Sequence, residues 1–225
     1  MKKVFKALML SALVLIVCFS LVACGTNFTQ VNHKDAFSQV QASLDQRIGN
    51  ISVVEQSLNS AASSRTTYIY FDGNKTLFSV NAGSNNFTSY YVTQNGSYVL
   101  ITNDPPEGYT QTVVETNGGF NYYTSNIKPL LALGTHFDKF AQHAQNRRRS
   151  DIELYLKAEY LEYIGNLLEL PSLTLMQINI NYQNIQNQDL STLTFMFEKN
   201  NNGEERRVTI TLGLATNPFT VPEKP

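Results

Sequence analysis

Three segments near the end of the chain alternate between apolar and polar side chains. Apolar residues occupy every second position in 176–182, 193–197 and 208–214, and the polar stretch 199–204 separates the last two segments. Successive side chains of a β-strand point to opposite faces of the sheet. The alternation therefore predicts three antiparallel strands, each with one buried and one solvent-exposed face.

A longer series of strand-like segments precedes them. Gly73-Asn74, Asn95-Gly96 and Gly118-Gly119 have the composition of hairpin turns. The short segments around these turns are rich in β-branched and aromatic residues, as strands are. We predict an antiparallel meander of about six strands at 66–71, 75–80, 87–92, 97–101, 110–114 and 120–124.

Helical patterns lie before and after this meander. Apolar residues spaced three and four apart predict a helix within 34–57, which Gly49-Asn50 breaks or ends. A second helix is expected over 137–149. A third should begin at Ser150, which has capping-box spacing to Glu153, and stop at Pro171. The order of elements predicts an α+β fold, with an antiparallel β-sheet of about nine strands and helices packed on one face.

This order of elements resembles the LolA/LppX-like lipoprotein fold. The likeness rests on the run of strands, the helix from Ser150 and the final strand pair. In that family a curved, incomplete barrel holds helices against its concave face, and acyl chains or lipoproteins occupy the apolar space between them. The resemblance implies a curved sheet and an apolar or acyl ligand for this chain.

The first residues have the layout of a secretory signal. Lys2, Lys3 and Lys6 precede an apolar run over 7–23. Leu21-Val22-Ala23-Cys24 resembles the lipobox of bacterial lipoproteins. The resemblance implies cleavage between Ala23 and Cys24 and attachment of acyl chains such as palmitate at Cys24. The alternative is an uncleaved signal anchor, since about 17 apolar residues is the short limit for a membrane-spanning helix.

The leader sets the expected domain organisation and location. We expect a signal peptide at 1–23, a lipidated cysteine and tether at 24–32, and a single α+β domain at 33–225. The protein is then lipid-anchored at the extracytoplasmic face of the cell membrane. Cys18 leaves with the leader, so the mature chain has one modified cysteine and forms no internal disulfide.

The near-zero net charge argues against a nucleic-acid partner. The chain has 17 basic and 18 acidic residues, a net charge of −1. Removing three lysines and no carboxylate with the leader brings the net charge to about −4. A nucleic-acid-binding protein would show a basic excess on one face, so no nucleic-acid partner is expected.

Motifs of catalysis and metal binding are missing from the sequence. We find no nucleophile elbow, zinc-protease helix or phosphate-binding glycine loop. His136 and His143 lie about 10.5 Å apart along a regular helix, too far to share one zinc ion. We therefore expect no metal, no cofactor and no enzymatic activity. The alternative is a hydrolase with paired carboxylates, for which the candidates are Asp104, Glu107, Asp151, Glu153, Glu159 and Glu162.

Tyrosine is the residue type that most suggests a binding surface. Eight of the twelve tyrosines fall in or beside the first group of strands. Aromatic side chains on a sheet face offer a rigid apolar area with a polar tip, although ordinary β propensity and cross-strand packing are the simpler explanation. The candidate ligand-binding residues are Tyr68, Tyr70, Tyr90, Tyr98 and Tyr122.

These observations favour a membrane-anchored surface lipoprotein that binds an apolar or acyl ligand, or an envelope protein, without catalysing a reaction. One alternative is a structural accessory subunit of an envelope protein complex, which would show an exposed aromatic patch. The other is the envelope hydrolase, which would show two carboxylates converging in a cleft.

Overall fold

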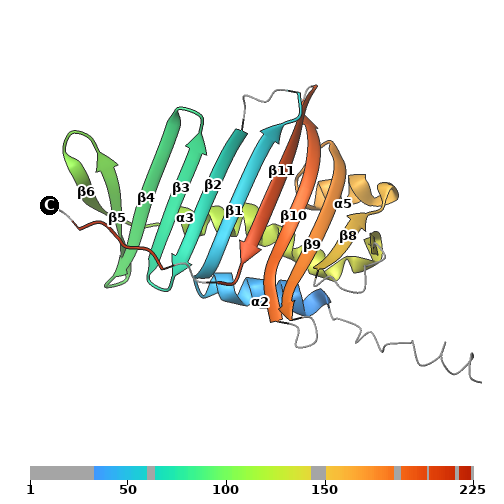
Figure 1. Cartoon of the computed structure of the whole chain (residues 1–225), viewed down its shortest axis with the longest axis horizontal. Helices are drawn as coiled ribbons and strands as arrows, with labels where there is room; N and C mark the ends of the chain where they lie inside the picture. Colours follow the sequence, from blue (N-terminus) through green and yellow to red (C-terminus); the bar gives the residue numbers. More distant parts are fainter. Residues whose placement is uncertain are drawn as a thin grey trace, which may run out of the picture. The chain divides into compact units, whose positions relative to one another are not determined.

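One antiparallel sheet of eleven strands dominates the protein (Figure 1). The computed structural model describes residues 33–59, 64–142, 151–184, 189–201, 203–215 and 218–223. The order across the sheet is β6-β5-β4-β3-β2-β1-β11-β10-β9-β8-β7. The strands are β1 (Ile48–Ser57), β2 (Ser64–Asp72), β3 (Lys75–Ala82), β4 (Asn85–Gln94), β5 (Ser97–Asp104), β6 (Gly108–Val114), β7 (Phe140–Gln142), β8 (Asp151–Leu156), β9 (Leu173–Asn184), β10 (Asp189–Asn201) and β11 (Glu204–Gly213).

The sheet is built from two meanders that meet in its middle. Strands β1 to β6 step outward to one edge, and β7 to β11 return from the other edge. The two meanders join where β1 pairs with β11, from Asn50↔Gly213 to Ser57↔Arg206. Between β6 and β7 the chain crosses the sheet along one face through short helical segments (Figure 1). These are α3 (Gly118–Tyr122), η1 (Tyr123–Ile127), α4 (Lys128–Leu131), η2 (Ala132–Thr135) and η3 (Phe137–Lys139).

The core lies between the sheet and its helices. Cross-strand partners share a face, so Val53 of β1, Ile210 of β11 and Phe195 of β10 form one buried row. Helix α2 (His33–Asp45) packs on this row, and the Phe37 ring meets the Phe195 ring edge-on at 5.8 Å. On the same face, α5 (Leu161–Leu167) contacts β9. We call this side of the sheet the helix face, and the opposite side the outer face.

The α+β class with helices on one face is therefore confirmed. The sheet is open, because neither β6 nor β7 has a second strand neighbour among the described residues. It has eleven strands rather than about nine, because the sequence did not predict β1, β7 and β8 and wrongly predicted a strand at 120–124. No helix in the described part of the chain is long and apolar enough to cross a membrane.

The predicted helix within 34–57 is correct only for its first half. Helix α2 ends at Asp45, and Arg47 then takes a left-handed backbone conformation with φ of 59°. Residues 48–57 form the strand β1. The apolar residues of this strand also fit helical spacing, which made the two structures indistinguishable in the sequence.

The predicted strand at 120–124 is wrong, because this segment starts the crossing helices. The side chain of Asn117 caps α3 by accepting a hydrogen bond from the Phe120 N–H at 3.0 Å. Gly119 lets the helix approach the sheet closely. A Cβ atom at this position would lie 2.8 Å from the Thr76 methyl carbon.

The predicted helix from Ser150 to Pro171 is also wrong in its first part. Residues 151–156 form β8, with Ile152, Leu154 and Leu156 buried in alternation. Only the segments η4 (Ala158–Tyr160) and α5 are helical. Of the helix predicted at 137–149, residues 137–139 form a 3-10 turn and 140–142 form β7, while the rest lies outside the described residues.

The last described segment lies on the outer face. Residues 218–223 run across β4 and β5 (Figure 1), and the Phe219 ring lies 6.4 Å from the Tyr90 ring. Ile101 pairs with Tyr90 on this face and is only 4% exposed. The terminal segment thus covers apolar side chains that no helix reaches.

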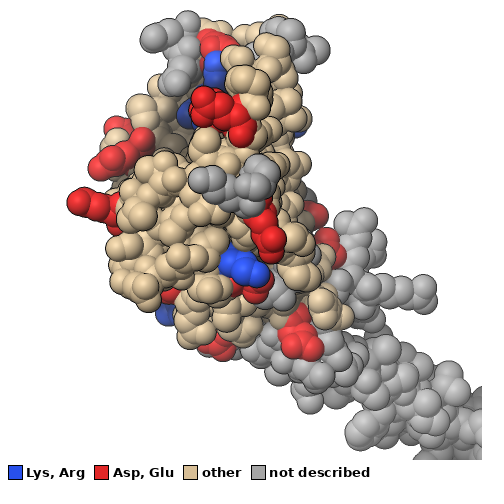
Figure 2. All heavy atoms as spheres, turned by 90° about the vertical axis from the view of Figure 1, so that its left-hand side faces the viewer, with Lys and Arg blue, Asp and Glu red and all other residues tan. Residues whose placement is uncertain are grey.

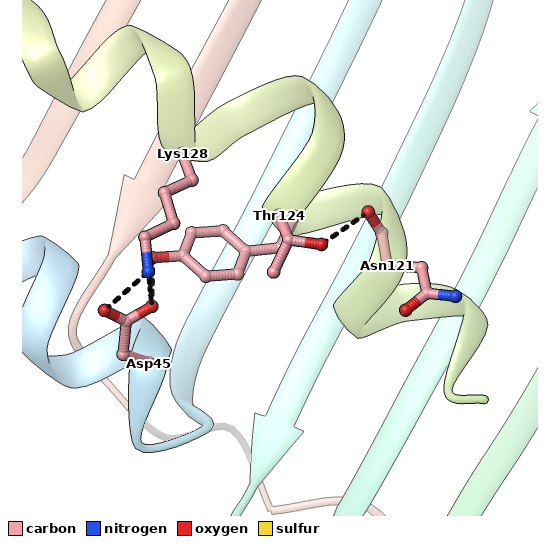
Figure 3. Close-up of polar contacts among 5 residues, drawn as sticks. Asp45, Asn121, Thr124 and Lys128 are labelled. Carbon is pink, nitrogen blue, oxygen red and sulfur yellow. Dashed lines mark hydrogen bonds and ion pairs between the residues drawn. The ribbon is translucent and has the colours of Figure 1, made fainter. Parts of the chain in front are cut away.

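An ion pair ties α2 to the crossing helices (Figure 3). The Lys128 ammonium donates to both Asp45 carboxylate oxygens, at 2.9 and 3.0 Å. The hydroxyl of the fully buried Tyr123 donates to the same carboxylate at 2.9 Å. Burial raises the pKa of Asp45, but the hydrogen bonds from Lys128 and Tyr123 outweigh it and hold the pKa below its usual value.

This lowered pKa makes the stability of the protein depend on pH. The stabilisation is complete above the unfolded-state pKa of about 4 and disappears as the pH falls through the lower folded-state pKa. Because the pair is partly exposed, we expect Asp45→Asn to cost about 1 kcal/mol or less at neutral pH and almost nothing near pH 2. Urea unfolding at both pH values measures this difference. Asp104→Asn, at the exposed carboxylate that ends β5, is the control. A cost for Asp45→Asn that is equal at both pH values would contradict the prediction.

Candidate functional site

The crossing helices leave part of the helix face uncovered. The N-terminus of α3 lies over β2, β3 and β4, where it approaches Ile69, Thr76 and Tyr91. The Asn117 side-chain amide donates to the buried Thr76 hydroxyl at 2.9 Å and fixes the helix there. Further along β3 and β4, towards the turn that joins them, the sheet has only half-buried and exposed side chains. This uncovered area is where a ligand can reach the sheet.

A groove of about 510 Å³ occupies the uncovered area. Cross-strand register places Val80 opposite Phe87 and Phe78 opposite the small, buried Ser89. We call this hollow the β3–β4 groove. The residues that matter for its chemistry are Arg65, Phe78, Val80, Ala82, Asn86 and Phe87.

Aromatic rings form the wall of the β3–β4 groove. The Phe78 ring meets the Phe87 ring edge-on, with centroids 5.8 Å apart, and lies 5.9 Å from the Tyr122 ring of α3. Phe87 is 47% exposed, a large fraction for a phenylalanine on the face that elsewhere forms the core. A ligand with an apolar segment would cover this ring and remove it from water.

A second hollow of about 450 Å³ lies where β4 and β5 separate. The two strands pair only from Ser89↔Thr102 to Gln94↔Ser97, so residues 85–88 of β4 have no partner in β5. Phe87 borders this hollow as well as the β3–β4 groove. Tyr90 and Tyr109 lie on its wall, and burial followed by the neighbouring Tyr109 raises the pKa of Tyr90.

The five tyrosines selected from the sequence do not share one surface. Tyr68, Tyr70 and Tyr90 lie on the outer face, where the first two rings stack at 6.3 Å. Tyr98 lies on the helix face, and Tyr122 belongs to α3. A single platform formed by all five is not present in the structure.

Tyr98 has a structural partner. The Arg47 guanidinium donates a short hydrogen bond to the Tyr98 hydroxyl and another, of 3.2 Å, to the Thr93 hydroxyl. The same guanidinium lies over the Tyr98 and Phe120 rings, 5.1 and 4.8 Å from their centroids. These contacts link the turn before β1 to β4, β5 and α3. Tyr98 is therefore occupied in packing.

The aromatic residues of the groove were not among the candidates selected from the sequence. Phe78 and Phe87 lie in correctly predicted strands, but the hairpin register that brings them together is not visible from composition. A signal was present nonetheless. In the hairpin of β3 and β4, Phe78, Val80 and Phe87 fall on the same side as the buried Thr76 and Tyr91. The cationic Arg65 beside them was also missed.

The candidate carboxylates lie in separate places. Asp104 and Glu107 are exposed around the cis Pro105–Pro106 bond, and Glu159 and Glu162 are exposed on η4 and α5. Asp151 and Glu153 belong to β8, where the Tyr155 hydroxyl donates to Glu153 at 3.3 Å. Within the described ranges, no group of three or more His, Cys, Asp or Glu side chains has the arrangement of a metal site. The His136 ring packs edge-on against Tyr163 at 5.9 Å. His143 lies outside the described residues.

Charge is sparse at the end of the sheet formed by β6. Figure 2 shows this side of the molecule, and most of the described surface there is neither acidic nor basic. Strand β6 contains no charged residue, and its Val113 is 71% exposed. The sheet, the helices and the groove together define an α+β protein whose helix face has an open, partly apolar hollow.

The comparisons with known proteins give a structural likeness but no relative by sequence. No protein-family model matches the chain, and no curated protein matches its sequence. Among solved structures, the chain is similar to the lipoprotein LppX of Mycobacterium tuberculosis, with a TM-score of 0.38 and 11% sequence identity. The match covers 84% of this chain and 98% of LppX. The fold class given above rests on the sheet topology of this chain alone.

Proposed function

We propose that this protein is a lipid-anchored, non-enzymatic binding module of the bacterial envelope, and that its β3–β4 groove takes the acyl chain of a ligand. The observation that carries this proposal is the uncovered apolar part of the helix face. Phe87 and Phe78 belong to the face that forms the core elsewhere, yet they border open space. An apolar ligand would complete the packing that the helices leave unfinished.

The size and chemistry of the groove support this ligand class. Its volume of about 510 Å³ falls within the range of small-molecule sites. Its wall carries aromatic and aliphatic side chains together with Ser84, Asn85 and Asn86, and no carboxylate or histidine. Each 40 Å² of apolar surface removed from water contributes about 1 kcal/mol. A ligand that covers the exposed part of Phe87 and its neighbours thus gains affinity without a catalytic group.

The anchor is part of the same proposal. The lipobox and Cys24 lie outside the described residues, and their role rests on the sequence pattern. Two or three acyl chains on Cys24 would hold the mature protein at the extracytoplasmic face of the membrane. The tether 24–32 reaches at most about 30 Å. The groove would then lie close to a bilayer that contains acyl ligands.

Photo-crosslinking of the full chain tests both parts of the proposal. Bacteria expressing the chain receive a fatty acid with a photoreactive diazirine near its methyl end, and cross-linked peptides are mapped by mass spectrometry after irradiation. We expect light-dependent adducts within 75–90. Label on Cys24 should form without light, because there the fatty acid is attached enzymatically.

A matched pair of variants identifies the face that binds. Phe87→Ser removes the exposed ring of the groove and should reduce the adducts about tenfold, equivalent to a loss of roughly 1.4 kcal/mol in binding. Tyr68→Ser removes a comparably exposed ring, 39% against 47%, from the outer face and should leave them unchanged. Labelled Cys24 without groove adducts, or adducts that depend on Tyr68 instead, would refute binding in the groove.

A protein partner is the second candidate function. It is favoured by the open edge of β6, which carries no charged residue and exposes Val113. Sheet edges in soluble proteins are usually protected by charges, proline or a covering segment. Cross-linking of β6 to an envelope protein, with no acyl adduct in the groove, would favour an accessory subunit over a ligand carrier.

A further inference from the structure

The β3–β4 groove contains a single charged side chain. Arg65 of β2 is exposed at the groove wall, and no other Lys, Arg, Asp or Glu lines the hollow. The apolar side chains Phe78, Val80 and Phe87 lie beside it. The groove therefore combines an apolar wall with one positive charge, which is the complement of an amphiphile with a negative head.

The guanidinium of Arg65 is available to a ligand. Among the residues that the structure describes, none forms a hydrogen bond or an ion pair with it. This includes Glu55, its register partner on β1, although both side chains lie on the helix face. By contrast, Arg206 and Arg207 on β11 are both ion-paired with glutamates. Arg65 thus differs from the paired arginines at the middle of the sheet.

Strand register places Arg65 at the end of the groove nearest the turn between β3 and β4, because Thr66 and Thr67 of β2 pair with Asn81 and Val80 of β3. Burial and the Glu55 carboxylate raise the pKa of the Tyr122 hydroxyl, and Arg65 partly opposes this rise. Tyr122 in turn contacts Phe78 of the groove wall. The positive charge therefore lies at one end of the apolar wall, and Val80 and Phe78 follow it along β3 towards α3.

A free guanidinium selects for a particular head group. Its planar fork of N–H donors matches a carboxylate or a phosphate, which accepts two parallel hydrogen bonds. We propose that the ligand of the groove is an anionic amphiphile whose carboxylate or phosphate head is bound by Arg65 while its acyl chain lies on Phe78, Val80 and Phe87. This inference rests on the proposed function and adds the charge of the ligand to it.

The preference for an anionic ligand comes from Arg65 and not from the charge of the whole protein. The chain as a whole carries a net charge of −1, so it attracts no anionic lipid through its overall field. Nor is Arg65 part of a basic patch, because the groove wall offers no second cation. Preference for an anionic ligand would therefore depend on this one side chain.

The test compares head groups on the same acyl chain. The full-length protein is exchanged into an amphipathic polymer and photolabelled with three diazirine probes of equal chain length: a fatty acid, a phosphatidic acid and the uncharged fatty alcohol. We expect the acid, the phosphatidic acid or both to label the groove about tenfold more than the alcohol. The ratio between the two anionic probes distinguishes a free fatty acid from a phospholipid.

Variants of Arg65 separate the head group from the chain. Arg65→Gln should reduce labelling by the anionic probes to the level of the alcohol, and Arg65→Lys should restore part of the preference. Lys75→Gln removes a positive charge from the other end of β3 on the outer face and should change nothing. Because Arg65 is exposed, Arg65→Gln should fold normally, which its urea midpoint verifies.

The two proposals fail in different ways. Equal labelling of the groove by all three probes in the unmodified protein would overturn the role of Arg65 and leave the acyl-binding groove intact. Preference for anionic probes that survives Arg65→Gln would do the same. No labelling of the groove by any probe would overturn the proposed function itself, and the head-group inference with it.

Discussion

Replacing Phe195 with alanine should lower the free energy of unfolding by about 3–5 kcal/mol. Phe195 lies on β10 near the middle of the sheet and is 0% exposed. Its neighbours across the sheet are Ile178 and Ile210, and the Phe37 ring of α2 packs on it edge-on. Removing the ring would leave a cavity that strands paired on both sides cannot close.

The control for this prediction is the same substitution on the same face of the sheet. Phe87→Ala removes an identical ring from the β3–β4 groove, where about half of it is already in contact with water. We expect a cost of about 1 kcal/mol or less there. Equilibrium unfolding in urea gives both values. Comparable losses for the two variants would show that the core does not lie between β10 and α2.

Gly49→Ala should cost roughly 3 kcal/mol or more, because two separate features of the backbone oppose a side chain there. Gly49 is the second residue of β1 and has φ of 117°, a backbone conformation that L-amino acids with a side chain rarely adopt. A Cβ atom at this position would meet the carbonyl oxygen of Gly213 on the neighbouring strand. This oxygen belongs to the backbone and cannot turn away as a side chain would.

Gly83→Ala separates the two features. Gly83 lies in the turn between β3 and β4 with φ of 64°, and an added Cβ would have no atom within 4 Å. We expect this control to cost about 1–2 kcal/mol from backbone conformation alone. The excess at Gly49, read from urea midpoints, measures the contact with Gly213. Equal costs at the two glycines would mean that β1 and β11 are less tightly joined than the structure shows.

The sequence predicted best where one residue pattern had one structural meaning. Alternation at 176–182 and 208–214 defined β9 and β11, because a helix with that pattern would have apolar residues all round. Ile48 and Ile51 fitted a helix as well as a strand. The spacing of Ser150 and Glu153 imitated a helix cap in what is the start of β8. Such short apolar segments are decided by the strands beside them, which the local sequence does not contain.

The candidate site was less predictable than the fold. Phe78 and Phe87 become neighbours only through the register of β3 on β4, and they face open space only because α3 ends its coverage at Tyr91. Both facts depend on contacts between distant segments. The tyrosines attracted attention because they are numerous, yet they are divided between the two faces. The number of aromatic residues thus pointed to the half of the sheet that contains the proposed groove, but it did not select Phe78 or Phe87.

The pairing of β1 with β11 also dictates the order in which the chain can complete its fold. The paired residues are roughly 160 positions apart in the sequence. Bringing them together costs the entropy of closing a long loop, so this pairing forms slowly. Until β11 has been made, β1 and β10 each have an unpaired edge in what will become the middle of the sheet. An unfinished or truncated chain therefore presents two open strand edges, which can pair with another chain. The final hairpin converts two aggregation-prone halves into one sheet, and chaperone dependence before that moment is the expected consequence.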